Sequence, residues 1–130
     1  MTSLNAKTRV LLVDDRGANR YVLGRILQNA GFAVEACATG MQALDAARTL
    51  PAVVILDIKL PDISGYEVCR VIKNDPLTRP IPVLLMSAAF ATEQIPPEIA
   101  RIGAEGFLVH PFKAADVVEK IKSVLLHEPL

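Results

Sequence analysis

Short runs of consecutive apolar residues alternate with amphipathic segments along this 130-residue chain. A run with no polar positions suits a strand that is buried on both faces, as in a parallel sheet. Such runs occur at Val10–Val13, Val53–Leu56, Val83–Met86 and Phe107–Val109. Residues 32–37 are less uniformly apolar and suit an edge strand. The alternation predicts an α/β fold of the (βα)₅ type, an open five-stranded parallel sheet with helices on both faces.

The segments between the apolar runs carry helical periodicity. A third helix is predicted from Ser64-x-x-Glu67, a capping-box pattern, to Asp75-Pro76, and a weaker fourth helix over residues 97–102. The apolar stripes predicted for the first, second and last helices are Ala18, Val22, Ile26 and Ala30 with Leu23 and Leu27 beside them; Met41, Leu44, Ala47 and Leu50; and Ala114, Val117, Val118, Ile121, Val124 and Leu125.

Length and charge limit the classes of function. We expect one domain over residues 1–130, with an ordered core of about 8–126. Fourteen basic residues balance fourteen acidic ones, which argues against direct nucleic-acid binding through a broad basic surface. No apolar run approaches the ~20 residues that span a bilayer, and residues 1–9 lack the apolar core of a signal peptide. We therefore expect no membrane association and a cytoplasmic location. Cys37 and Cys69 form no metal-binding or redox motif.

Polar residues follow four of the apolar runs directly. Asp14 and Asp15 follow Val13, and Asp57 follows Leu56. Ser87 follows Met86, and His110 follows Val109. Because ligands bind beyond the carboxyl ends of parallel strands, we expect these side chains to share one edge of the sheet.

Three carboxylates at one point repel one another, and a divalent cation relieves the repulsion. Mg²⁺ suits the set best, because it binds through one or two carboxylates, retains waters and shares phosphate oxygens. An aspartate can also attack a phosphoryl group and form an acyl phosphate. The sequence therefore predicts a Mg²⁺ site with phosphoryl-transfer chemistry.

These residues lie in stretches that resemble the receiver domain of two-component response regulators over nearly the whole chain. The matching stretches are residues 10–15, residues 56–65 with an Asp-x-x-x-Pro-x-x-x-Gly motif, residues 82–88 and residues 103–112. The resemblance implies a flavodoxin-like sandwich with strand order 2-1-3-4-5. It also implies a signalling phosphoacceptor rather than a dedicated enzyme, with Mg²⁺ as cofactor.

The resemblance also implies roles for individual residues. Asp57 matches the phosphoacceptor, and Asp14 and Asp15 match the acid pair that holds Mg²⁺ with the backbone carbonyl of Lys59. Ser87 matches the hydroxyl that hydrogen-bonds a phosphoryl oxygen.

Phe107 matches the aromatic switch of the family. The implied donor of the phosphoryl group is a histidine kinase or a histidine phosphotransfer protein. The implied output is a change of partner, or formation of a homodimer, at the face formed by the fourth helix, fifth strand and fifth helix.

His110 departs from the family, which has lysine at this position. Lysine carries a permanent charge, whereas histidine is charged only part of the time near pH 7. The alternative to a phosphoacceptor is therefore a pseudo-receiver, an interaction module that does not use phosphate.

Lys59 argues against an aspartate-nucleophile phosphatase, which carries an acid at this position. Residues 14–17 lack the glycine pattern of a dinucleotide site.

Overall fold

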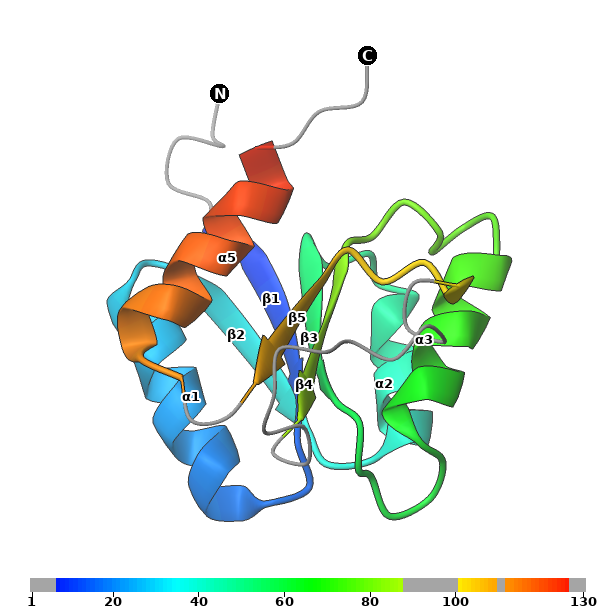
Figure 1. The fold of residues 1–130 in the computed structure, drawn as a ribbon, viewed down its shortest axis with the longest axis horizontal. Coiled ribbons are helices and arrows are strands. Elements are labelled where there is room, and N and C mark those ends of the chain that lie inside the picture. Colours follow the sequence, from blue (N-terminus) through cyan, green and yellow to red (C-terminus); the bar gives the residue numbers. More distant parts are fainter. Residues whose placement is uncertain (1–6, 88–100, 110–111, 127–130) are drawn as a thin grey trace.

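The computed structural model describes residues 7–87, 101–109 and 112–126, and its centre is one parallel sheet (Figure 1). The five strands are β1 (Arg9–Val13), β2 (Ala33–Cys37), β3 (Val53–Asp57), β4 (Val83–Ser87) and β5 (Gly106–Val109). They are arranged in the order β2-β1-β3-β4-β5. The predicted α/β fold, the strand order and the edge position of β2 are confirmed.

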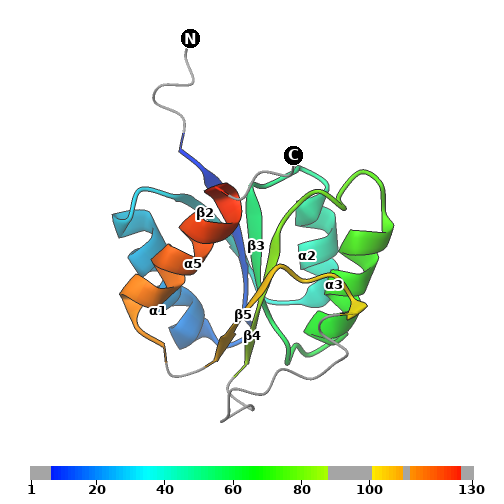
Figure 2. The ribbon, with the colours of Figure 1, turned by 45° about the horizontal axis from the view of Figure 1, so that its top comes forward.

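Helices cover both faces of the sheet (Figure 2). Helices α1 (Gly17–Asn29) and α5 (Ala114–Leu126) lie on one face, and α2 (Gly40–Ala47) and α3 (Gly65–Asn74) lie on the other. The fourth helix predicted over residues 97–102 falls largely outside the described residues. None of the helices that the structure describes is long and apolar enough to cross a membrane.

Each central strand contributes alternate side chains to two apolar cores. In β1, Leu11 and Val13 belong to the core under α2 and α3, whereas Val10 and Leu12 belong to the core under α1 and α5. The same alternation continues in β3 and β4, and all of these positions are at most 1% exposed. Burial on both faces explains why Val10–Val13, Val53–Leu56 and Val83–Met86 contain no polar residue.

The buried face of α1 differs from the predicted stripe. Leu23 and Leu27 are buried against the sheet, whereas Val22 is 56% exposed and Ala18 and Ala30 are also exposed. Residues four apart lie on one helix face, so both the predicted stripe and the observed one satisfy helical periodicity. The leucine side chains lie against the core together with the half-buried Ile26, whereas Ala18, Val22 and Ala30 are turned toward solvent.

The predicted stripe of α2 also needs correction. Its fully buried side chains are Ala43 and Ala47, while Leu44 is half-buried. Met41 is 60% exposed and Leu50 is 49% exposed. Small alanine side chains on the inner face allow α2 to lie close to the sheet.

Hydrogen bonds at the helix ends fix the loops. The hydroxyl of Ser64 accepts from the backbone N–H of Glu67 at 3.2 Å, which is one of the two hydrogen bonds of the predicted capping box, and α3 ends before Asp75. At α2, the side chains of Thr39 and Gln42 form a complete capping box. Capping satisfies N–H groups that have no partner within the helix, so these loops are held at defined positions.

Candidate functional site

The strand register places the acidic residues side by side at the carboxyl edge of the sheet. Val13 pairs with Leu56, so Asp14 and Asp57, the next residue of each chain segment, lie abreast. One carboxylate oxygen each from Asp14, Asp15 and Asp57 lies within 4.8 Å of the others. The predicted convergence of these carboxylates is confirmed by the geometry.

Asp57 is the buried member that faces the pocket, with 5% of its surface exposed. Its Oδ1 accepts a hydrogen bond from the backbone N–H of Lys59 at 3.1 Å. The pKa of Asp57 is raised to about 6, mainly by burial and also by the nearby charge of Asp14, against the opposing effects of the Lys59 N–H and Arg16. The ionised carboxylate of Asp57 therefore lowers the stability of the folded protein, and a bound cation would offset this loss.

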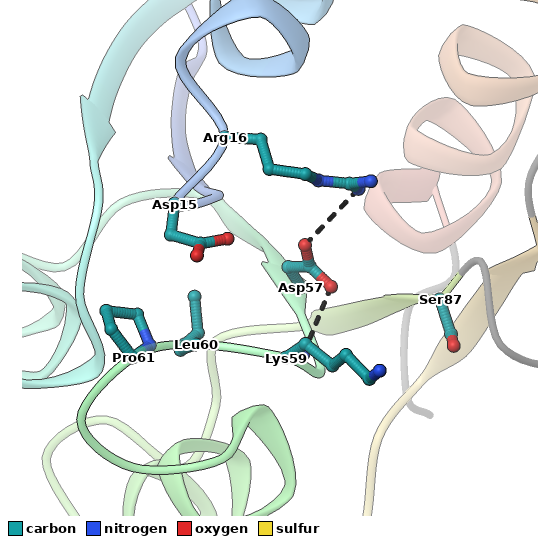
Figure 3. Close-up of a pocket in the computed structure, with 7 residues that line it drawn as sticks. All are labelled: Asp15, Arg16, Asp57, Lys59, Leu60, Pro61 and Ser87. Atoms are coloured by element: carbon teal, nitrogen blue, oxygen red, sulfur yellow. Dashed lines mark hydrogen bonds and ion pairs between the residues drawn. The ribbon is translucent and has the colours of Figure 1, made fainter.

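Arg16 is a site residue that the sequence analysis did not assign. Its Nη2 lies 3.5 Å from Oδ2 of Asp57 (Figure 3). Its Nε lies 3.6 Å from Oδ1 of Asp14. Its backbone N–H also donates to Asp14 Oδ1 at 2.9 Å. Its place directly after the acid pair at a strand end is the sequence signal that could have indicated this role.

Asp14 is fixed by the same loop. It is 1% exposed, and Nη1 of Arg20 donates to its backbone carbonyl at 2.7 Å. Its own N–H donates to the carbonyl of Cys37 on β2 at 3.1 Å. Hydrogen bonds therefore hold both the backbone carbonyl and the backbone N–H of Asp14, whereas Asp15 is exposed and faces the pocket.

The loop after β3 closes the other side of the pocket, where Lys59, Leu60 and Pro61 line it (Figure 3). The N–H of Gly65 donates to the carbonyl of Ile58 at 2.7 Å. A Cβ on Gly65 would collide with the Asp57 carbonyl oxygen and lie 2.8 Å from Cα of Ile58. The last glycine of the Asp-x-x-x-Pro-x-x-x-Gly motif therefore permits α3 to begin against the end of β3.

Asp62 anchors this loop to α2, a contact that the sequence analysis missed. Its two carboxylate oxygens accept from the backbone N–H groups of Gly40 and Met41, each at 2.8 Å. These two hydrogen bonds lower the pKa of Asp62 below its ordinary value. The contact joins residues 22 and 21 positions apart, so local sequence patterns do not indicate it.

The remaining predicted site residues come from β4 and β5. Ser87 is 3% exposed and lines the pocket with Asp57, as its place at the end of β4 predicts. Phe107 is half-buried, pairs in register with Leu85 of β4 and packs against the core under α2 and α3. His110 lies outside the described residues, so the role expected for it stays a prediction.

The carboxylate set fits a magnesium ion. Ligand oxygens stand about 2.0–2.1 Å from Mg²⁺, so two on opposite sides of one ion are separated by about 4 Å. The 4.8 Å spread of the cluster matches direct contact by some carboxylates and contact through water by another. Mg²⁺ commonly keeps several waters in this way.

The two cysteines take no part in this site. Both are free, and burial raises the pKa of each thiol to about 11. Cys69 lies on the buried face of α3 and packs in the core, and Cys37 is half-buried at the end of β2. Thiols protonated at neutral pH are poor nucleophiles and poor metal ligands.

Fold and site together define a flavodoxin-like α/β protein with an acidic edge at the carboxyl ends of its strands. The family model of the response regulator receiver domain matches residues 10–122, and the chain belongs to this family of signalling proteins. Receiver domains bind Mg²⁺ in their active site.

Curated relatives agree with this assignment. The two-component response regulator ORR11 of Oryza sativa subsp. indica is 36% identical over 125 residues, which cover 92% of this chain and 82% of the relative. The transcriptional regulatory protein CreB of Escherichia coli (strain K12) is 37% identical over 118 residues. The match covers 89% of this chain and 50% of CreB, so the chain corresponds to about half of that relative.

Solved structures show the same fold. A putative response regulator from Chloroflexus aurantiacus J-10-fl superposes with a TM-score of 0.84 at 32% identity, covering 93% of this chain and 99% of that one. The receiver domain of the sensor histidine kinase PA1611 from Pseudomonas aeruginosa PAO1 has a TM-score of 0.83 at 26% identity, covering 92% and 98%. That structure has a magnesium ion coordinated in its active site cleft.

Proposed function

We propose that this chain is a single receiver domain that accepts a phosphoryl group on Asp57 in a Mg²⁺-dependent reaction. The observation that carries the proposal is the convergence of three carboxylates from two strand ends, with the buried Asp57 facing the pocket. The donor is a histidine kinase or a histidine phosphotransfer protein. The domain itself helps this transfer and the later loss of the phosphoryl group, and it is not a dedicated enzyme.

Asp14, Asp15 and Asp57, together with the backbone carbonyl of Lys59, would hold the magnesium ion. When bound, Mg²⁺ neutralises charge on the carboxylates and on the phosphoryl oxygens. Asp15 is exposed and free to coordinate, whereas Asp14 already accepts the N–H of Arg16 and would act through water. Because burial and Asp14 raise the pKa of Asp57, a cation here also favours its ionised, nucleophilic form.

Phosphoryl transfer joins an Asp57 carboxylate oxygen to phosphorus while the bond from phosphorus to the donor atom breaks. The Lys59 N–H orients the carboxylate through Oδ1. The hydroxyl of Ser87, which lines the same pocket, donates to a phosphoryl oxygen. Added charge at the strand end then requires donors on every side, so the residues around it rearrange.

Phe107 couples this rearrangement to the surface. It lies on β5 beside β4, the strand that ends in Ser87. A movement of Ser87 toward the phosphoryl group changes the space available to the aromatic ring. The face that includes β5 and α5, with the fourth helix of the family, is where partner binding or dimer formation would respond.

The alternative function is a pseudo-receiver, an interaction module that keeps the fold without using phosphate. It rests on His110, which replaces the lysine of the family. A histidine at this position makes phosphoryl transfer dependent on pH, since only the protonated imidazole carries charge.

The test is incubation with acetyl phosphate and Mg²⁺, followed by intact-mass spectrometry. We expect one phosphoryl group on the wild type and none on Asp57→Asn, with no labelling of either protein in excess EDTA. His110→Lys, measured beside them, shows how far the imidazole limits the rate. A wild type that accepts no phosphoryl group, from acetyl phosphate or from a panel of kinases, would support the pseudo-receiver and refute the proposal.

A further inference from the structure

Arg16 occupies a position that its own helix does not favour. It is the N-cap of α1, in extended backbone with φ −89° and ψ 112°, and its side chain makes no capping hydrogen bond. Ser, Thr, Asp or Asn is preferred here, and a positive charge is unfavourable at a helix N-terminus. Local helix stability therefore does not explain an arginine at this position.

The acidic site explains the arginine instead. Among the described residues, the ion pairs to the acidic cluster all come from this guanidinium, which lies between Asp14 and Asp57. Asn19, one turn into α1, supports it. With its amide oxygen turned toward Arg16, Asn19 accepts from Nη2 at 2.7 Å and from Nε at 3.0 Å.

The two oxygens of Asp57 have different neighbours. Oδ1 accepts the Lys59 N–H, and Oδ2 faces Nη2 of Arg16 at 3.5 Å. A group attached to Oδ2 lies within reach of the same guanidinium. Half of the Arg16 side chain is exposed, so it has room to adjust to such a group.

We propose that Arg16 binds the phosphoryl group on Asp57 and so acts as a catalytic cation of this site. The proposal rests on the phosphoacceptor function proposed above. A phosphoryl group carries a charge of about −1.5 to −2 at neutral pH. The planar guanidinium offers parallel N–H donors that match phosphate oxygens, and it stays charged at every physiological pH.

The reaction to be measured is balanced. An Asp57 oxygen attacks the phosphorus of acetyl phosphate, the bond from phosphorus to the acetate oxygen breaks, and acetate leaves with the electron pair. In this step Arg16 transfers no proton. It stabilises the charge on the phosphoryl oxygens as they move toward Asp57.

The experiment compares the wild type with Arg16→Gln and Arg16→Lys at saturating Mg²⁺. The initial rate of labelling by acetyl phosphate is followed by intact-mass spectrometry, and Mg²⁺ affinity is measured separately by calorimetry. We expect Arg16→Gln to slow labelling by about tenfold or more. Arg16→Lys should retain part of the rate, since it keeps the charge but loses the planar donors. Arg25→Gln, at an exposed position of the same helix, is the matched control and should label like the wild type.

Mg²⁺ affinity separates phosphoryl binding from a merely structural role. If Arg16 contacts the phosphoryl group, Arg16→Gln binds Mg²⁺ at least as tightly as the wild type, because a competing cation has been removed. If Arg16 only organises the carboxylates, Arg16→Gln binds Mg²⁺ more weakly and saturating Mg²⁺ restores its rate, which overturns the proposal.

Two further outcomes distinguish the proposals from each other. Equal labelling of Arg16→Gln and wild type overturns the role of Arg16 and leaves Asp57 as phosphoacceptor. A wild type that is never labelled refutes the phosphoacceptor function and the role of Arg16 with it.

Discussion

Replacing Asp57 by asparagine should stabilise the metal-free protein at neutral pH. Burial raises the pKa of this carboxyl from 3.8 to about 6. A raised pKa means that folding favours the protonated form, so the ionised form costs stability. The cost is absent below about pH 4, grows as the pH rises toward 6 and is complete above that. Asparagine is uncharged at every pH and keeps an oxygen to accept the Lys59 N–H.

The size of the effect follows from the pKa. The difference between 3.8 and about 6 corresponds to roughly 3 kcal/mol, at about 1.4 kcal/mol for each pKa unit. Because solvent enters the pocket and screens the charges, we expect Asp57→Asn to gain about 1–3 kcal/mol. For a domain of this length, each kcal/mol raises Tm by roughly 3–5 °C.

The assay is urea unfolding at pH 5 and pH 7.5 in the presence of EDTA. The advantage of Asp57→Asn over the wild type should be larger at pH 7.5 than at pH 5. Asp62→Asn is the control of opposite sign, because hydrogen bonds lower the pKa of Asp62 and its charge is stabilising. The reasoning fails if Asp57→Asn is no more stable than the wild type at pH 7.5.

Magnesium should reduce the stability advantage of Asp57→Asn over the wild type. A ligand that binds only the folded state at one hundred times its Kd adds about 2.7 kcal/mol. The wild type should gain this stabilisation, and Asp57→Asn should gain less because one ligand charge is lost. Addition of Mg²⁺ to both proteins in the same urea series therefore tests whether the cost at Asp57 is the one that the cation offsets.

Three further predictions concern packing and the thiols. Gly65→Ala should lose about 1–3 kcal/mol in urea unfolding, since the added methyl group collides with the end of β3; unchanged stability would contradict the close approach. Leu27→Ala should cost about 2–5 kcal/mol, whereas Val22→Ala should cost less than about 1 kcal/mol, because Leu27 is 0% and Val22 56% exposed; equal losses would contradict the exposed position of Val22. Cys37 and Cys69 should react with a disulfide reagent at pH 8 more slowly than in urea, because burial raises both pKa values to about 11.

The sheet and the acid cluster could be predicted because both follow from short stretches of sequence. A stretch that is buried on both faces contains no polar residue, so the first polar residue that follows it marks the carboxyl edge where ligands bind. Asp14 and Asp57 are such residues, and the register of β1 with β3 brings them together. The buried faces of the helices are harder to predict, because in α1 the stripe through Val22 and the stripe through Leu23 both have a helical period.

Contacts between loops distant in sequence could not be predicted in the same way. Asp62 caps α2 from the loop after β3, and nothing in the residues around it indicates that partner. Arg16 was next to the predicted acid pair, but its contact with Asp57 depends on how the β1–α1 loop turns over the sheet edge. Sequence periodicity describes strands and helices, and the path of such a loop depends on the packed structure.

The packed strands also explain why the protein can hold these charges together. The core residues of β1 and β3 before the acids are at most 1% exposed, so the ends of both strands are fixed by apolar packing rather than by the site. Asp14 and Asp57 cannot move apart to relieve their repulsion without disturbing that core, and Arg16 relieves only part of it. The repulsion therefore remains in the folded, metal-free state, where it weakens folding and strengthens the binding of any cation that fits. Rigid strand ends would thus convert part of the stability of the fold into affinity for the Mg²⁺ ion that we propose for this site.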